Sequence, residues 1–357
     1  MFGPTGLPHA MTMTSPANPW VVDESHFPAA GSAEEQRMAL LQWAILAPSS
    51  HNAQPWRFAV DRTRIHVFAD PSCRLRVADP DRREFFVSIG CALENLLVAA
   101  AHFGFATETF YAPDLAEQGA EASDLFRVAT IHVDRKRPAS GARAALFDAI
   151  TKRKTNHDPF EERDVAAEDL LALKEHVDEE DIRLWMTEDE ETHAAVQSMT
   201  ARANAMQFVD QEWREELAEW IGKGAFGTPW LFSKIGELAM TYLDLSDATT
   251  AKDRQRIASA PVLAVLVAEE DSPRMHVRAG QVLERVWLAA TQRGIQLQPM
   301  NQILQIPEIK KEVQRLLPDV SMHPQITFRI GYGAPERKHT PRRSVEDVVV
   351  GAPTTHT

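Results

Sequence analysis

The spacing of apolar residues predicts helices and strands in both halves of the chain. In residues 32–47 a Ser32–Glu35 capping box precedes apolar positions at helical spacing, and Pro48 ends the pattern. A mostly apolar, alanine-rich helix is expected over residues 85–104. Alternation predicts strands at 56–60, 65–67, 128–132 and 182–186, and a continuous apolar run predicts one at 261–268. Further helices are expected at 141–151 and 166–177. Both halves therefore predict a mixture of α and β structure.

An internal repeat is the strongest organisational signal. The pattern Gly-x-x-Leu-Glu-x-x-(Leu/Trp)-(Val/Leu)-Ala-Ala-x-x-x-Gly runs from Gly90 to Gly104 and again from Gly280 to Gly294, so that matching positions are always 190 residues apart. Buried alanine-rich helices can look alike by chance, but one shared register for Gly, Leu, Glu and Ala-Ala favours a duplication. We expect a flexible tail at 1–25, a first half at 26–138 and a second half at 139–351.

The second half contains a segment, residues 204–253, that has no counterpart in the first. It is predicted to be an aromatic-rich helical insertion. Two interpretations stay open for its aromatic side chains, namely additional core packing or a lid over a site. These side chains are Phe208, Trp213, Trp220, Phe226, Trp230, Phe232 and Tyr242.

Composition disfavours several classes of protein. The chain has 357 residues, 44% of them hydrophobic, which is enough for one large core or two ordinary ones. A net charge of -13 disfavours a general nucleic-acid binder or a binder of anionic membranes. Cys73 and Cys91 stand far apart without a CxxC pair, so neither a zinc site nor a disulfide framework is predicted. The first twenty residues lack signal-peptide features and no spanning helix is expected. We expect a soluble, cytoplasmic protein.

The loop between the first helix and the first strand is rich in groups that can bind a ligand. It reads Pro-Ser-Ser-His-Asn-Ala-Gln-Pro-Trp over residues 48–56. Serine and asparagine favour local side-chain to backbone bonds over regular structure, so a strand does not require this sequence in front of it. A plain surface turn is the alternative. His51 is as well explained as an ordinary polar turn residue, and Trp56 as a core residue that begins a strand.

Two basic segments could hold a phosphate. One is Lys152-Arg153-Lys154-Thr155-Asn156-His157, and the other is Thr340-Pro341-Arg342-Arg343-Ser344. Arginine binds phosphate through charge-assisted and often bidentate hydrogen bonds. Each segment alone could equally be a solvated helix end, because cations favour helix C-termini.

Together these segments resemble the FMN-dependent nitroreductase family. The family pattern Pro-Ser-Ser-x-Asn-x-Gln-Pro-Trp is present in full at residues 48–56. The segment Arg153-x-Thr155-x-His157 is similar to the family's Arg-x-Ser-x-Arg/Lys, and Arg342 is similar to its closing arginine. His157 departs from the usual second cation, because a neutral imidazole carries no charge. The division of these motifs between two halves resembles the duplicated, single-chain Acg-type subfamily.

The resemblance implies an α+β fold of two duplicated nitroreductase-like halves, each with a mixed or antiparallel sheet packed against helices, so that one chain imitates the usual dimer. It also implies one complete FMN site per chain. The second site is expected to be degenerate, because Asp178-Glu179-Glu180-Asp181 stands where the Pro-Ser-Ser loop should recur. The cofactor-binding residues expected from the resemblance are Pro48, Ser49, Ser50, Asn52, Gln54, Arg153, Thr155, His157, Pro299, Met300, Asn301, Arg342 and Arg343.

The predicted function is hydride transfer from NADPH or NADH through FMN to a small acceptor, such as a nitroaromatic or a quinone. No protein nucleophile, catalytic side chain or metal is expected, because the flavin carries the hydride and the protein binds and orients. Two alternatives stay open. The chain could store flavin beneath a lid without turnover, or it could have lost flavin and serve as an interaction module. We expect a monomer, with a homodimer as the alternative.

Overall fold

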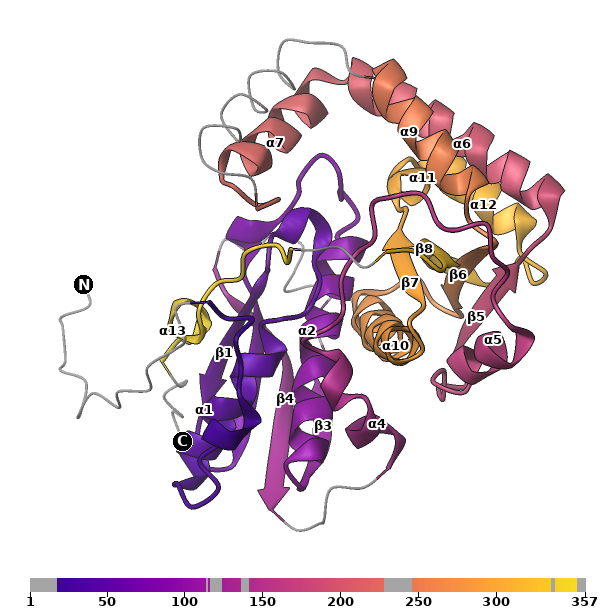
Figure 1. Ribbon diagram of the computed structural model, residues 1–357. Helices are drawn as coiled ribbons and strands as arrows, with labels where there is room; N and C mark the ends of the chain where they lie inside the picture. Colours follow the sequence, from indigo (N-terminus) through magenta and orange to yellow (C-terminus); the bar gives the residue numbers. More distant parts are fainter. Residues whose placement is uncertain are drawn as a thin grey trace.

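The structure is a computed structural model, and it describes residues 18–113, 115, 124–135, 141–227, 246–334 and 338–351. Most of the predicted tail, residues 1–17, lies outside the described residues. The same is true of Trp230, Phe232 and Tyr242 in the predicted insertion. Figure 1 shows two lobes, each built on one sheet, with helices α2 and α10 side by side between them.

The described strands form two four-stranded antiparallel sheets. The first sheet has the order β1-β2-β4-β3 and the second has the order β5-β6-β8-β7, so the same topology occurs twice. This arrangement confirms the predicted α+β fold class. The strands are β1 (Trp56–Val60), β2 (Arg64–Ala69), β3 (Phe105–Tyr111), β4 (Phe126–Arg135), β5 (Ile182–Thr187), β6 (Val262–Ala268), β7 (Gln296–Pro299) and β8 (His323–Gly331).

Helices cover the sheets and separate the two lobes. α1 begins at the predicted capping box, in which Ser32 and Glu35 bond reciprocally, and it ends three residues before the expected Ala47. The helices are α1 (Ala33–Ala44), α2 (Arg83–His102), α4 (Ala142–Ala145), α5 (Ala167–Lys174), α6 (Glu190–Val209), α7 (Gln211–Gly222), α9 (Ser246–Ala258), α10 (Pro273–Gln292), α11 (Gln302–Gln305), α12 (Pro307–Leu316) and α13 (Val345–Val348).

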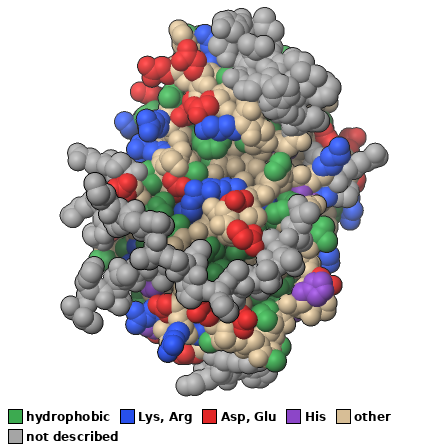
Figure 2. Space-filling view, turned by 90° about the vertical axis from the view of Figure 1, so that its left-hand side faces the viewer, with side chains coloured by type: hydrophobic (Ala, Val, Ile, Leu, Met, Phe, Trp, Pro, Cys, Tyr) green, Lys and Arg blue, Asp and Glu red, His purple; other side chains and the backbone are tan. Residues whose placement is uncertain are grey.

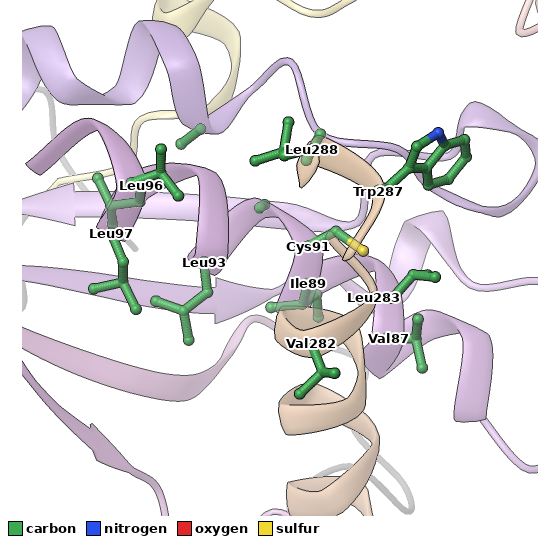
Figure 3. Packing of buried hydrophobic residues seen from close by; sticks show 14 of the residues in the cluster. Val87, Ile89, Cys91, Leu93, Leu96, Leu97, Val282, Leu283, Trp287 and Leu288 are labelled. Carbon is green, nitrogen blue, oxygen red and sulfur yellow. The ribbon is translucent and has the colours of Figure 1, made fainter. Parts of the chain in front are cut away.

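Helices α2 and α10 pack so closely that only glycine fits at their crossing. A Cβ atom on Gly90 would overlap the carbonyl oxygen of Val277, and one on Gly280 would overlap the carbonyl oxygen of Val87. The two contacts are reciprocal, since Val87 and Val277 are also related by the repeat. Figure 3 shows the apolar side chains around this contact, including Trp287. The glycines that begin the repeated pattern therefore allow the two lobes to join.

Within the described part of the chain, one helix is long and apolar enough to cross a membrane. This helix is α2, and 89% of its most apolar window is buried inside the protein. Its neighbours are α10, α1 and β3. Its apolar surface is therefore covered by the protein core, as expected for a central helix of a large domain.

Two sequence predictions need correction. The helix predicted at 141–151 is instead the short α4 followed by a 3-10 turn at Phe147–Ala149, and no side chain caps either piece. Without a capping side chain the first amide groups lack a partner, which disfavours a longer helix. The helical block of the second half begins at Glu190, before residue 204, because α6 has its own cap at Asp189.

The two ends of the described chain meet on the first lobe (Figure 1). Val349 forms a parallel bridge with Phe58 of β1, and the Val350 amide donates to the Phe58 carbonyl at 2.8 Å. Trp20, which was predicted to lie in the flexible tail, instead packs against the core and against residues 339–342. The C-terminal segment of the second half thus completes the first lobe.

Candidate functional site

The Pro-Ser-Ser loop has an unusual backbone. His51, Asn52 and Gln54 all adopt left-handed conformations, with φ of 49°, 53° and 50°. Such conformations cost about 1 kcal/mol or more each in residues other than glycine. The Ser49 hydroxyl helps to hold this turn by accepting from the Gln54 amide at 3.0 Å. A backbone strained at three positions is more than a connection between helix and strand, which disfavours the plain surface turn.

The closing segment holds Arg342 against this loop. The Arg342 guanidinium donates to Asn52 Oδ1 at 2.7 Å and to Thr340 Oγ1 at 2.6 Å. It also reaches the carbonyl oxygen of Leu46, at 3.4 Å, where α1 leads into the loop. Residues almost 300 positions apart in the sequence are therefore in direct contact.

Arg153 reaches the same point from the second half. Its guanidinium is buried, donates to the Leu46 carbonyl at 3.0 Å, and lies 4.8 Å from the centre of the Trp287 ring. Its Nε atom lies 3.3 Å from Glu284 Oε1, on α10. Arg153 and Arg342 thus converge on one carbonyl group, with Glu284 as a nearby carboxylate.

The two guanidinium groups of this cluster carry more positive charge than the single carboxylate of Glu284 can balance. Burial raises the pKa of Glu284 to about 7, although Arg153 and Arg342 oppose the shift. Burial and the neighbouring Arg153 lower the pKa of Arg342 to about 9. Burial, Lys154 and the two arginines lower the pKa of His339 to about 4, so its imidazole is neutral at pH 7. A protonated Glu284 would leave both guanidinium charges without compensation.

A phosphate group fits the donors that are left. In the described part of the chain, Arg342 Nε and His339 Nδ1 are buried without a hydrogen-bond partner, and Arg153 Nε has only its ion pair with Glu284. Buried donors without partners are rare in folded proteins and need an explanation. A phosphate would supply acceptor oxygens and negative charge to both guanidiniums. The residues present therefore fit the phosphate end of a flavin mononucleotide.

The segment around Thr155 lies along β7. Thr155 forms a parallel bridge with Leu297, and the Asn156 amide donates to the Leu297 carbonyl at 3.2 Å. Buried Arg329 fixes the next turn, because its guanidinium donates to the carbonyl oxygens of Asn156 and Asp158. This segment therefore has a defined path from Arg153 along the strand that ends at Pro299.

His157 occupies the position of the predicted second cation. It lies beside Gln298, whose Nε2 is 3.2 Å from His157 Nδ1. The residue as a whole is exposed. Even so, the surrounding protein removes water from its imidazole, and this desolvation lowers its pKa. The positive charges of Arg256 and Arg329 lower it further. The imidazole is neutral at pH 7 and does not add a charge to the cluster.

The segment Pro299-Met300-Asn301 follows β7, next to α11. The Met300 amide donates to the Thr327 carbonyl at 2.7 Å, and Asn301 Oδ1 accepts from the Thr327 amide at 3.1 Å. The Met300 side chain is buried among Phe160, Ile257 and Leu263. Proline has no amide hydrogen, so of these three residues only Asn301 has an amide without a protein acceptor among the described residues.

Polar side chains of the Pro-Ser-Ser loop are already bonded to protein. Gln54 Oε1 accepts from the Arg343 amide at 2.8 Å, and Asn52 Nδ2 donates to the Pro341 carbonyl at 2.8 Å. Ser50 donates its hydroxyl to Glu84, at the start of α2. The structure therefore brings Asn52 and Gln54 to the closing segment, and it places the Ser50 hydroxyl on α2. Pro48, at the end of the α1 turn, is half-buried.

Arg343 points away from the two converging arginines. Its guanidinium donates to the Asp347 carbonyl at 3.0 Å and lies 4.0 Å from Cys73 Sγ. Its backbone amide, rather than its side chain, contacts the loop through Gln54. Two adjacent arginines in the sequence therefore have different surroundings in the structure.

Helix α7 of the predicted insertion lies above the first lobe, as Figure 1 shows. The Glu216 carboxylate accepts from the amides of Val77 and Ala78, the latter at 2.8 Å. Asn52 Nδ2 donates to the Ala225 carbonyl at 2.8 Å, just after the helix. Trp220 packs in a small apolar cluster with Ala53. Part of the insertion therefore covers the loop, which supports the lid interpretation for the described aromatic residues of α7.

The equivalent position in the other lobe is filled by protein charges. Arg285 donates to the His176 carbonyl at 3.2 Å and to Asp178 at 2.8 Å, and it pairs with Glu179 and Glu94. His176 follows α5 as Leu46 follows α1. The acidic segment that replaces the second Pro-Ser-Ser loop thus saturates an arginine. This leaves no excess of positive charge for a second phosphate.

Sequence reasoning missed three residues of the site. Glu284 belongs to the repeat, and a glutamate within an apolar helix could have indicated a buried cationic partner. His339 directly precedes the closing segment that the sequence analysis selected. Trp20 had no signal, because its contact with Thr340 joins positions 320 residues apart. Figure 2 shows basic side chains near the middle of one face of the molecule, close to residues that are not described.

Comparisons with known proteins agree with the motifs. No protein-family model matches the chain. It is 29% identical over 345 residues to putative NAD(P)H nitroreductase Rv3131 of Mycobacterium tuberculosis, covering 91% of this chain and 93% of the relative. It is 25% identical over 320 residues to putative NAD(P)H nitroreductase acg of the same species, covering 86% and 93%. A solved putative nitroreductase from Anabaena variabilis is 10% identical over 84% of this chain and 88% of that one, with a TM-score of 0.49.

The fold and site define an α+β protein whose described strands form two like sheets, with a cationic cluster where its halves meet. In sequence, the chain is similar over most of its length to M. tuberculosis proteins named putative NAD(P)H nitroreductases, acg among them.

Proposed function

We propose that this protein binds one FMN per chain and is an oxidoreductase of the nitroreductase type. It would pass hydride from NADPH or NADH to a small acceptor such as a nitroaromatic or a quinone. The observation that carries the proposal is the convergence of Arg153 and Arg342 on the Leu46 carbonyl, beside the Pro-Ser-Ser loop. The names of the M. tuberculosis relatives support the activity and the nicotinamide donor.

The proposed roles follow from these contacts. Arg153 and Arg342 would hold the phosphate, and Thr155 would stand next to it on the segment along β7. The Pro-Ser-Ser loop would approach the flavin ring, and Asn301 would supply a backbone amide. Asn52 and Gln54, whose side chains bond to the closing segment, would hold the loop in place for this contact. When bound, FMN supplies a carrier that accepts a hydride and passes it to an acceptor. The protein would hold and orient it and exclude water, without a nucleophile.

A second candidate is a protein that stores flavin without turnover. The position of α7 favours it, because Glu216 bonds this helix to residues 77 and 78 and the carbonyl of Ala225, just after the helix, accepts from Asn52 of the Pro-Ser-Ser loop. A helix fixed there could prevent nicotinamide from reaching the ring. Both candidates bind FMN, and they differ in whether a nicotinamide donor can reach the flavin ring.

Flavin content tests the shared part of the proposal. The purified protein should show the absorption bands of bound flavin, with one FMN per chain. Arg153→Ala and Arg342→Ala should lose FMN, since each change leaves roughly 1.5 to 3 kcal/mol of charge-assisted bonding unmade. Arg343→Ala is the matched control, because its side chain points to Asp347, and it should keep its flavin. Full flavin content in both test variants would refute the phosphate site.

Anaerobic reduction separates the two candidates. NADPH or NADH should bleach the flavin band of the wild-type protein if it is an oxidoreductase. A flavin that neither donor bleaches would refute that activity. In that case Glu216→Gln, which weakens the attachment of α7 to residues 77 and 78, should restore bleaching if the helix excludes the donor.

We further propose that the chain arose by duplication and acts as a monomer that imitates a dimer. The repeated strand order and the reciprocal glycine contacts between α2 and α10 support the duplication. The boundaries proposed above, 26–138 and 139–351, place one sheet in each half. A soluble cytoplasmic location remains part of this proposal.

A further inference from the structure

Trp20 stands against the cationic cluster although no motif includes it. Its indole Nε1 donates to the Thr340 carbonyl at 2.8 Å. Its ring stacks on the His339 imidazole with centroids 3.8 Å apart and an interplanar angle of 18°. The Arg342 guanidinium carbon lies 4.8 Å from the centre of the same ring. One aromatic side chain thus contacts three residues between positions 339 and 342: the His339 ring, the Thr340 carbonyl and the Arg342 cation.

These contacts act on the arginine that faces the proposed phosphate. The Arg342 guanidinium donates hydrogen bonds to Asn52 and Leu46, and it also makes a cation–π contact with the Trp20 ring. The neighbouring His339 is neutral at pH 7, so it can stack on the indole without adding a third positive charge to the cluster. The hydrogen bond to Thr340 fixes the backbone on which Arg342 stands.

Trp20 also occupies the outer side of the cluster. The residue is half-buried, and its flanking residues Pro19 and Val21 are half-buried and exposed respectively. Arg153 is buried, whereas Trp20, His339 and Arg342 are all half-buried, so the Trp20–His339 stack lies on the solvent side of Arg153. A ligand whose chain continued beyond its phosphate would meet the Trp20–His339 stack.

We propose that Trp20 is a positioning residue that fixes Arg342 and closes the phosphate end of the site, so that the site accepts a terminal phosphomonoester and excludes the adenylate extension of a flavin dinucleotide. This inference rests on the proposed FMN site. It concerns a residue that none of the binding motifs includes.

The test compares FMN and FAD binding to apoprotein of the full chain, by quenching of flavin fluorescence. The wild-type protein should bind FMN at least tenfold more tightly than FAD. Trp20→Ala should weaken FMN binding by about tenfold, as expected for loss of a cation–π contact and a hydrogen bond. It should weaken FAD binding less or improve it, so that the preference for FMN falls by about tenfold. Trp20→Phe keeps a ring and should retain most of the preference.

Trp185→Ala serves as the matched control, because this tryptophan is also half-buried but lies on β5 of the other lobe. It should leave both affinities unchanged. His339→Ala removes the stack by a different route and should reduce the preference for FMN if Trp20→Ala does not fold.

Three results would overturn the inference. The first is equal binding of FMN and FAD by the wild-type protein, and the second is an unchanged preference in Trp20→Ala. The third is a parallel loss of both affinities together with a lower melting temperature, which would show a merely structural role. If the wild-type protein bound no FMN at all, the proposed function itself would fail, and this result is distinct from the other three.

Discussion

Glu284 should make FMN binding dependent on pH. This carboxyl group is fully buried, lies 3.3 Å from Arg153 Nε, and has a pKa of about 7. A phosphate held by the same arginine would repel the charged form, so FMN should bind preferentially when Glu284 is protonated. Above pH 7, where Glu284 is mostly deprotonated in the free protein, FMN binding would therefore be accompanied by uptake of one proton by Glu284.

The size of the effect follows from the pKa. If only the protonated form binds, the dissociation constant of FMN rises with the deprotonated fraction, by roughly eightfold between pH 6.5 and pH 8.0 for a pKa of about 7. Glu284→Gln cannot ionise and should bind FMN with nearly constant affinity. The remaining change should be less than about twofold and of opposite sign, because the second pKa of a phosphate monoester is near 6.

Fluorescence titrations at several pH values at constant ionic strength provide the measurement. The control is Glu94→Gln, the equivalent buried glutamate of α2, which pairs with Arg143 and Arg285. It should keep the pH dependence, with a midpoint slightly lower, because the Glu94 charge contributes to raising the pKa of Glu284. An eightfold loss that persisted in Glu284→Gln would refute the assignment of the linked proton.

The remaining predictions concern the fold, the phosphate site, the cover and protein stability. Gly280→Ala should destabilise the protein by roughly 3 kcal/mol or more, measured by denaturant unfolding, because its Cβ would overlap the Val87 carbonyl; a change below 1 kcal/mol would contradict this contact. Arg342→Ala should raise the FMN dissociation constant at least tenfold and leave riboflavin, which lacks the phosphate, nearly unaffected; equal losses would argue against a phosphate contact. Glu216→Gln should speed limited proteolysis within α7, and unchanged cleavage would show that the carboxylate is not its attachment. In apoprotein the raised pKa of Glu284 contributes stability that is present below about pH 4.5 and is lost as the pH rises through about 7, by up to about 3 kcal/mol; Glu284→Gln should remove this part of the pH dependence of thermal unfolding.

Local sequence was sufficient for the parts of the fold that local chemistry decides. The Ser32–Glu35 capping box, the strands beginning at Trp56 and Ile182, and the central helices around Gly90 and Gly280 all occur where the patterns predict them. Boundaries were less accurate where no side chain marks the end. The segment 141–151 illustrates this, since it has good helix-forming residues but no capping group.

The sequence by itself also determined the repeat, the separation of the phosphate motif from the Pro-Ser-Ser loop, and the acidic replacement in the second half. These are properties of residue type and spacing, which a chain carries before it folds. Tertiary structure alone decided that Arg153 and Arg342 share the Leu46 carbonyl, that Glu284 and Trp20 belong to the site, and that α7 lies over the loop. Such contacts depend on which elements pack together across hundreds of residues, and no local preference encodes that choice.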